Sequence, residues 1–419
     1  MNKYSQKVHC MLKLITKSDK QMNDLLLNVE ALAFGEGGED MHCVGFGDVE
    51  FPFLIIKVEY VMNAFLETSI SILLVFLFAA CSSVSDEKMM SYSDFPETRA
   101  LAARTLPLDT ALFRYPYRVR ILVDKAIVMD LHGTDYFFHV FNYPSFHYLS
   151  SFGKRGDAPE DMLSAENIRW NGSSVWTLDA NKSELTRLGF ALSGDSLFRQ
   201  EVVSLDENIL RALDFVQYDD SIFIIPDYSG DNRFCLANRE GKLLRRLGII
   251  PTTNEEALKN TRPVLAQAWR SFMDYNPRNG VIAAVTQLGE VLEIYNLKDS
   301  THVVCIGPHG EPEFQVAEGY GIPTGIMGFG DVQVTDNAIY AVFQGKSFKD
   351  IMESAKRGNK LPDGGQSIYV FSLRGEPLRK YVLDHYVHGI FVDEQRGAII
   401  ALDVNMDEPI LEYSINCMF

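Results

Sequence analysis

Short apolar runs alternate with polar turns along most of the chain after residue 100. Residues 389–415 show the pattern most clearly, as an apolar segment, a polar turn, the run "GAIIALD", a second polar turn and a third apolar segment. The same order of segments recurs at residues 168–188, 215–237 and 271–297, and less completely at 118–142 and 331–345. Apolar segments of this length between turn residues predict β-strands joined by tight turns.

The residue that closes the second strand of each unit sets the length of the repeat. Six such anchor residues occur at intervals of 48 to 60 residues, namely Asp130, Asp179, Asp227, Gln287, Gln344 and Asp403. Four short strands in a unit of roughly 50 residues are typical of one blade of a β-propeller. We therefore predict an all-β fold, a six-bladed β-propeller. A two-domain β-sandwich is the alternative, but it does not account for six anchors.

The repeats also predict how the ring closes and where it is interrupted. An isolated four-stranded sheet leaves its faces and edges uncovered, whereas blades packed around an axis cover each other's faces. The last repeat ends after its third strand, so we expect its outer strand to come from residues 96–115. Two insertions, at residues 252–275 and 347–365, have the pattern of short helices.

A separate apolar run stands upstream of the repeats. The stretch "ISILLVFLFAA", residues 70–80, leads directly into Cys81. It is too short to cross a bilayer, which takes about 20 apolar residues, but it fits the apolar part of a secretory signal, about 7–15 residues long. Small residues directly before Cys81 resemble the lipobox of bacterial lipoproteins, in which the cysteine is acylated and becomes the first residue. We predict that Cys81 carries a lipid; a buried segment with a chance cysteine is the alternative.

This interpretation divides the chain into four parts. Residues 62–80 are predicted to be the lipoprotein signal peptide, residues 81–98 a flexible polar tether, and residues 99–419 the propeller. Residues 1–61 lie upstream of the signal peptide and are expected to be an over-extended N-terminus outside the fold. A genuine cytoplasmic segment followed by an anchor at residues 51–80 is the alternative.

Charge, cysteine content and motifs exclude several classes of protein. The formal net charge is −17, which argues against a nucleic-acid partner, because phosphate binding requires a basic surface. Six cysteines in 419 residues are too few for a disulfide scaffold. The sequence contains no HExxH, P-loop, G-x-S-x-G or CxxC motif, so it identifies no catalytic residue and no cofactor.

The turns between the repeats resemble those of a known family. The segments "IIPDYSGDNRFCLANREGKLLRRLG" and "CIGPHGEPEF" are similar to the repeats of NHL-type and TolB-like six-bladed propellers. Together with Cys81, they make the chain resemble the TolB-like propeller lipoproteins of Bacteroides-type bacteria over about residues 100–415. The resemblance implies a lipoprotein of the cell envelope, held at the outer membrane and facing the periplasm or the cell surface. It implies no particular ligand.

The six anchors are expected to surround one mouth of the propeller channel, because the turns between second and third strands all emerge at one end of the ring. One interpretation is that the Asp anchors accept hydrogen bonds from backbone N–H groups of nearby turns. The other is that the anchors form a polar ring that binds a ligand or a cation such as Ca²⁺.

Two functional hypotheses follow from this organisation. The first is a monomeric binding or scaffolding module, anchored to a membrane through Cys81, that presents the propeller to a protein, peptide or glycan. The second is a Ca²⁺-dependent hydrolase that uses the channel mouth. Calcium-dependent lactonases use the six-bladed fold in this way, with Asp, Asn and Glu of the inner strands as ligands. The sequence shows no clear set of such ligands.

Overall fold

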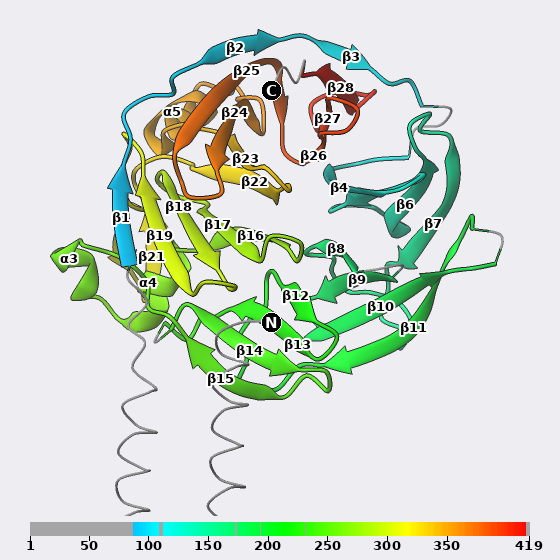
Figure 1. The fold of residues 1–419 in the computed structure, drawn as a ribbon, viewed down its shortest axis with the longest axis horizontal. Coiled ribbons are helices and arrows are strands. Elements are labelled where there is room, and N and C mark those ends of the chain that lie inside the picture. The colour runs from blue at the N-terminus through cyan, green and yellow to red at the C-terminus, as the bar shows by residue number, and fades with distance from the viewer. Residues whose placement is uncertain (1–86, 109–111, 172–173, 193, 231, 416–419) are drawn as a thin grey trace, which may run out of the picture. The chain divides into compact units, whose positions relative to one another are not determined.

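The computed structural model describes residues 87–108, 112–171, 174–192, 194–230 and 232–415. These residues form six antiparallel units, or blades, arranged around a central axis (Figure 1). The prediction of a six-bladed β-propeller is therefore confirmed. The predicted signal peptide at residues 62–80, the upstream residues 1–61 and Cys81 lie outside the described residues.

Each blade contains four strands that follow one another in space from the axis outward. The strands of blades 1 to 3 are β4 (Pro116–Leu122), β5 (Lys125–Asp130), β6 (Tyr136–Asn142) and β7 (Tyr148–Lys154); β8 (Ile168–Asn171), β9 (Ser174–Asp179), β10 (Glu184–Phe190) and β11 (Leu197–Ser204); and β12 (Val216–Asp219), β13 (Ile222–Pro226), β14 (Phe234–Asn238) and β15 (Leu243–Leu247).

The strands of blades 4 to 6 are β16 (Ser271–Asn276), β17 (Val281–Thr286), β18 (Val291–Asn296) and β19 (Thr301–Ile306); β22 (Phe329–Val334), β23 (Ala338–Phe343), β24 (Gly365–Ser372) and β25 (Pro377–Val387); and β26 (Ile390–Asp393), β27 (Ala398–Leu402), β28 (Ile410–Ser414) and β3 (Ala103–Thr105). A separate two-stranded hairpin consists of β20 (Phe314–Ala317) and β21 (Tyr320–Pro323).

The second strands carry the core of the propeller. Every described residue of β9, β17, β23 and β27 is buried, as expected for continuous apolar runs covered on both faces. The buried apolar side chains gather into one cluster at each of the six contacts between neighbouring blades. Each blade is therefore stabilised mainly by the faces of its two neighbours.

Ring closure follows the prediction. Strand β3 pairs with β28 in antiparallel register, Ala103 opposite Tyr413 and Thr105 opposite Leu411. The first described segment thus supplies the outer strand of the last blade, from within the expected residues 96–115. Because this contact joins the two ends of the propeller, the ring is closed by hydrogen bonds between strands as well as by side-chain packing.

The predicted tether at residues 81–98 differs from what the structure shows for residues 87–98. Strand β1 (Glu87–Ser91) pairs in parallel with β19, and β2 (Thr98–Leu101) pairs in parallel with β25. This segment therefore runs along the outer edges of blades 4 and 5 and leads into β3 at the edge of blade 6 (Figure 1). An outer strand exposes unpaired N–H and C=O groups, and a polar segment can pair with them through its backbone alone. Such pairing requires no apolar side chains, so the polar composition of the segment predicted a tether although the segment forms strands.

The two insertions contain the predicted helices. The first holds α3 (Glu255–Leu258) and α4 (Arg262–Ala268), and the second holds α5 (Phe348–Lys356). In α4, Pro263 lies in the first turn, where proline is well tolerated because that N–H has no helical partner. Gly358, just beyond α5, has a φ of +75°, which is typical of a helix end. None of the helices in the described part of the chain is long and apolar enough to cross a membrane.

Candidate functional site

The six inner strands surround the axis and run in the same direction. Asp331 on β22 accepts a hydrogen bond from the backbone N–H of Ile390 (3.0 Å), and Gln333, two residues later, accepts one from Val392 (2.7 Å). Moving two residues forward along β22 therefore corresponds to moving two residues forward along β26, which means that these neighbouring strands point the same way. The channel therefore has two different ends, here called the entry mouth, where the inner strands begin, and the exit mouth, where they end.

Six charged residues, five of them buried and Asp274 partly buried, cross the channel between these mouths and are here called the axial charge cluster. They are Arg118, Arg120, Arg169, Asp214, Asp274 and Asp331. Three guanidinium groups face three carboxylates, so the formal charges of the cluster balance. Buried charges are tolerated in proteins when they are paired and hydrogen-bonded in this way.

Asp331 is the acid on one side of the axial charge cluster. Its Oδ1 lies 3.3 Å from Nε of Arg118 and 3.6 Å from Nη2 of Arg120. Arg118 also donates to the carbonyl oxygen of Gly330 (2.8 Å). Burial lowers the pKa of Arg120, and the charge of Asp331 opposes this shift. These contacts join the first and fifth blades.

Arg169 is the base on the other side of the cluster. It donates to Oδ1 of Asp214 (2.9 Å), to Oδ1 of Asp274 (2.7 Å) and to the carbonyl oxygen of Phe215 (3.0 Å). It also donates to the carbonyl oxygen of Met273. Burial raises the pKa of Asp274, and the charge of Arg169 opposes this shift. The second, third and fourth blades are thereby joined through one guanidinium.

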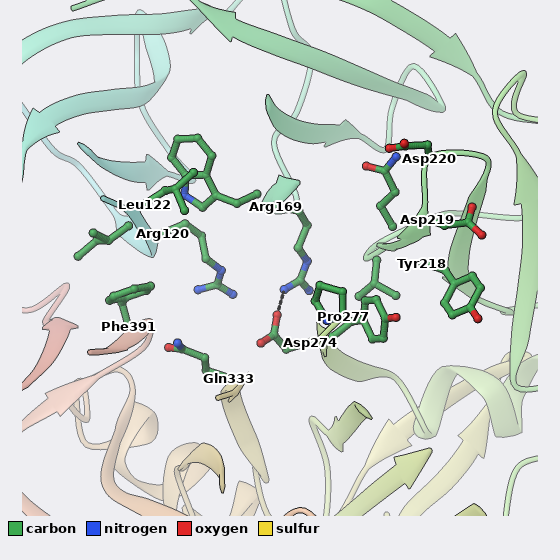
Figure 2. Close-up of a pocket in the computed structure, with 15 residues that line it drawn as sticks. Arg120, Leu122, Arg169, Tyr218, Asp219, Asp220, Asp274, Pro277, Gln333 and Phe391 are labelled. Carbon is green, nitrogen blue, oxygen red and sulfur yellow. Dashed lines mark hydrogen bonds and ion pairs between the residues drawn. The ribbon is translucent and has the colours of Figure 1, made fainter. Parts of the chain in front are cut away.

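A cavity of about 430 Å³ opens at the exit mouth, next to the axial charge cluster (Figure 2). Its volume lies within the range of small-ligand sites, about 300–1,000 Å³. The lining residues come from all six blades: Arg120, Ile121, Leu122, Arg169, Trp170, Val216, Gln217, Tyr218, Asp219, Asp220, Asp274, Tyr275, Pro277, Gln333 and Phe391. In Figure 2 the guanidinium groups of Arg120 and Arg169 lie at the centre, with Gln333 and Asp274 beside them.

Three residues that line this cavity each have one polar side-chain atom that is buried without a hydrogen-bond partner among the described residues. These atoms are Nη2 of Arg120, Nε1 of Trp170 and Oε1 of Gln217. Only Arg120 Nη2 has a charged neighbour, the carboxylate of Asp331 at 3.6 Å. A buried polar group without a partner costs about 1–3 kcal/mol, so these atoms are suited to hydrogen-bond a ligand.

Aromatic rings form much of the wall of the exit mouth. Trp170 stacks on Phe190, with ring centroids 5.8 Å apart and an angle of 16° between the planes. Tyr218 and Tyr275 lie 6.0 Å apart, and burial raises the pKa of Tyr275. The cavity thus combines ring faces with hydrogen-bonding groups, which suits a ligand that has apolar faces and polar edges.

The predicted anchors lie at the other end of the channel, near the entry mouth. The Asp130 carboxylate accepts backbone hydrogen bonds from Arg114 (2.7 Å) and Tyr115 (2.8 Å), which precede the inner strand of the same blade. The Asp179 carboxylate likewise accepts one from Leu163 (2.7 Å). Both carboxylates are fully buried and hold the connection between two blades in place.

Asp227 and Asp403 are also buried and bound within the fold. Asp227 accepts from the N–H of Ser229 (2.9 Å), and its other oxygen lies 3.1 Å from Nε of Arg246. Asp403 accepts from the N–H of Asn405 (2.9 Å) and lies 3.1 Å from the His385 ring. The four Asp anchors thus behave as expected for carboxylates that accept N–H groups of turns.

The two Gln anchors contact the same loop between blades 4 and 5. The carbonyl oxygen of Gln287 accepts from the N–H of Gly328 (2.8 Å), and the N–H of Gln344 donates to the carbonyl oxygen of Gly328 (2.9 Å). The side-chain Oε1 of Gln344 is buried without a partner. Among the contacts of the described residues, none joins two anchors directly, so a role of these six residues in ligand binding stays a prediction.

The described residues contain no group of three or more His, Cys, Asp or Glu side chains placed to hold a metal ion. His385 and His388 bind different carboxylates: His385 lies beside Asp403, and His388 lies 3.0 Å from Asp363. The Ca²⁺-dependent hypothesis therefore has no supporting arrangement in this part of the chain. Cys235 and Cys305 are buried free thiols, and burial raises the pKa of each to about 12.

Sequence reasoning missed the axial charge cluster, although a signal for its acids was present. Asp214, Asp274 and Asp331 each stand 13 residues before one of the anchors Asp227, Gln287 and Gln344. Asp274 and Asp331 lie on the inner strands β16 and β22, and Asp214 lies just before the inner strand β12. Arg120 and Arg169 show a similar signal, because each stands 10 residues before one of the anchors Asp130 and Asp179. Arg118 has no such counterpart in the cluster.

A family model described as TolB-like 6-blade propeller-like matches residues 93–395. Similar solved structures include an exported protein from Bacteroides fragilis (10% identity, 78% of this chain and 98% of that chain, TM-score 0.48). A DUF4221 family member from Bacteroides vulgatus is also similar (10% identity, 77% of this chain and 97% of that chain, TM-score 0.47). An auxiliary nutrient binding protein from Bacteroides ovatus is similar as well (10% identity, 73% of this chain and 70% of that chain, TM-score 0.45). No curated protein sequence matches the chain.

Proposed function

The chain belongs to the TolB-like six-bladed propeller family, and from this premise we propose that it is an extracytoplasmic binding module. The cavity at the exit mouth is its ligand site. The ligand is an uncharged polar molecule, best matched by the end of an oligosaccharide. A tether through a lipid on Cys81 would hold the module at the membrane of the cell envelope.

The observation that carries this proposal is the group of unpartnered polar atoms in the cavity. Trp170 and Arg120 offer N–H donors, while Gln217 offers a carbonyl acceptor. A sugar hydroxyl both donates and accepts hydrogen bonds, so adjacent hydroxyls can satisfy all three atoms. An apolar ligand would leave these atoms unpaired, at a cost of about 1–3 kcal/mol for each atom.

The charge balance of the site favours a neutral ligand. Arg169 is already bound by two carboxylates, and Asp331 lies close to both Arg118 and Arg120. A charged ligand would have to lose its hydration and compete with these internal pairs. An uncharged polar ligand can hydrogen-bond the outer atoms of the same groups and leave the pairs intact.

The aromatic wall favours an oligosaccharide over an extended peptide. The faces of pyranose rings are lined by C–H groups, which pack on aromatic rings such as Trp170 and Tyr218. An extended peptide adds most readily to the exposed edge of a sheet. At the exit mouth the lining comes from the ends of inner strands, which lie at the centre of the ring and present no outer edge.

Arrays of immobilised oligosaccharides and of peptides test the proposal with the full-length chain. We expect the wild-type chain to bind a subset of the oligosaccharides, and the Trp170→Phe and Gln217→Leu variants to lose at least tenfold in affinity for them. Gln315→Leu is the matched control, because Gln315 is exposed on β20 outside the cavity. Binding to peptides alone, or equal binding by all variants, would exclude the oligosaccharide site.

The same array separates binding from catalysis. It is to be read after incubation with Ca²⁺ and after incubation with a chelator. Equal signals in both conditions are expected for a binding module. A signal that disappears over time only with Ca²⁺, with release of shortened sugars, would instead support the hydrolase hypothesis.

A further inference from the structure

Arg270 has a buried side-chain nitrogen but forms no ion pair with any described residue. Four arginine side-chain nitrogens of the described chain are buried without a hydrogen bond, in Arg118, Arg120, Arg246 and Arg270. The first three face a carboxylate, at 3.3, 3.6 and 3.1 Å. Among the described residues, the guanidinium of Arg270 has neither an ion pair nor a hydrogen bond, although burying part of a charge without a partner is unfavourable.

Arg270 lines a second cavity, of about 300 Å³. It precedes β16, and Leu210 and Arg211 precede β12, so this cavity lies near the entry mouth, where the inner strands begin. The two cavities share no lining residue, and in blade 3 they are lined by Leu213 and by Val216, respectively. Residues of α4 and of the β20–β21 hairpin complete its wall.

Further groups in this cavity suit an anion. The hydroxyl of Tyr228 is buried without a hydrogen-bond partner, and Arg211 contributes a second guanidinium that forms no ion pair with any described residue. Two guanidinium groups offer positive charge and hydrogen-bond donors, and the phenol hydroxyl can donate as well. Such a set matches a carboxylate or phosphate rather than a cation.

The remaining wall is mostly apolar, apart from Gln267, whose Oε1 accepts a hydrogen bond from the N–H of Gly321 (3.0 Å). Leu210 is 50% exposed and Tyr320 is 59% exposed, and Pro263 lies beside them in the lining. Tyr320 follows a two-residue turn, Glu318 and Gly319, in which both residues have positive φ (52° and 80°). This turn type aligns the two strands of a hairpin and so keeps the Tyr320 ring at the cavity. An inorganic ion would leave these apolar side chains in water.

We propose that the cavity at the entry mouth binds a small organic carboxylate with an apolar body. Arg270 and Arg211 face the carboxylate, the Tyr228 hydroxyl donates a hydrogen bond to it, and the apolar body rests on Leu210 and Tyr320. This site is distinct from the proposed oligosaccharide site and does not depend on it.

The acidic residues near Arg270 leave room for such a ligand. Glu166 forms no ion pair with any described residue, and burial raises its pKa, against the opposing charge of Arg270. Asp214 is bound by Arg169. The net effect is a positive site with a partly buried acid nearby, so an added carboxylate meets two guanidinium groups that are not neutralised by a direct contact.

Isothermal titration of the full-length chain with hexanoate, hexanamide and inorganic phosphate tests this proposal. Hexanoate is expected to bind, while hexanamide and phosphate bind at least tenfold more weakly. Arg270→Met should weaken hexanoate binding at least tenfold, and Tyr228→Phe several-fold. Arg245→Met is the matched control, because Arg245 is exposed on β15 and has no ion pair; its affinity should equal that of the wild type.

A melting curve without ligand distinguishes a binding role from a structural one. Arg270 has no partner to lose, so Arg270→Met should melt no lower than the wild type. Trp170→Phe should bind hexanoate with unchanged affinity, which separates this site from the exit mouth. Hexanamide or phosphate binding as tightly as hexanoate would overturn the assigned ligand. Equal affinity of the Arg270→Met and Arg245→Met variants would overturn the site.

Discussion

Aspartate residues in this propeller serve two purposes that the sequence separates only in part. Asp130 and Asp179 accept N–H groups from the segments that lead into their blades, whereas Asp274 and Asp331 bind arginines across the axis. The position of Asp130 and Asp179 at the end of a second strand was predictable from the repeat. The arginine partners of Asp274 and Asp331 were not predictable, because they come from non-adjacent blades and meet these acids only in the closed ring.

The buried pair of Arg233 and Glu293 gives a prediction about stability. Oε1 of Glu293 accepts from Nη2 of Arg233 (2.7 Å), and Tyr295 donates to its other oxygen (2.6 Å). Glu293→Gln leaves the Arg233 charge buried without a counter-charge, so we expect a loss of about 3–5 kcal/mol in the free energy of unfolding. Urea unfolding at about pH 7 measures it.

The same pair predicts a pH dependence. Burial opposes ionisation of Glu293, but Arg233 and the hydrogen bonds outweigh it and lower its pKa to about 2. An unfolded glutamate has a pKa of about 4.3. The stabilisation is therefore complete above about pH 5 and is lost as the pH falls through about 2. The difference in the free energy of unfolding between the wild type and Glu293→Gln should fall by about half between about pH 7 and pH 3. A difference that stays constant over this range would contradict the lowered pKa of Glu293.

At the scale of the element, strand type was more predictable than strand partner. The apolar run "GAIIAL" indicated a buried second strand, and every residue of β27 is buried. The closing role of β3 followed from counting strands in the last repeat. The parallel pairing of β1 and β2 left no trace in the sequence, because backbone groups at a sheet edge can pair with any extended segment.

The closing strand gives a prediction at this scale. The N–H of Leu106 donates to the carbonyl oxygen of Ile410 (2.8 Å), so by the alternation of an antiparallel ladder the N–H of Arg104 faces the carbonyl oxygen of Glu412. Arg104→Pro removes this donor and should lower the free energy of unfolding by about 1–3 kcal/mol. Thermal and urea unfolding of the full-length chain measure the change.

Arg104→Ala is the matched control for the closing strand. It removes only the exposed ion pair between Arg104 and Glu412, which is worth less than about 1 kcal/mol. If the proline and alanine variants unfold alike, β3 does not contribute to closing the ring.

At the scale of the whole molecule, the propeller presents two mouths of different chemistry. The sequence predicted a single polar ring at the entry mouth, formed by the anchors. The structure also places a cavity lined by polar and aromatic groups at the exit mouth. The anchors could be predicted because they recur with the repeat. The cavity could not, because its walls are side chains that differ from blade to blade.

The proposed anchor gives a prediction for the molecule in its cell. If Cys81 carries a lipid, the wild-type chain should sediment with the membrane fraction and incorporate a labelled fatty acid. Cys81→Ser should leave the chain unlabelled and in the soluble fraction. Cys417→Ser is the control and should behave as the wild type. Membrane association that survives Cys81→Ser would contradict the lipid anchor.

The most direct test of the oligosaccharide site is a titration of tryptophan fluorescence. The chain has three tryptophans; Trp176 and Trp269 are no more than 1% exposed, and Trp170 alone lines the cavity at the exit mouth. Adding an oligosaccharide selected on the array to the full-length chain should change the emission in a saturable way. The change should be absent in Trp170→Phe, whose affinity is also reduced. A saturable change that persists in Trp170→Phe with unchanged affinity would contradict the proposed site.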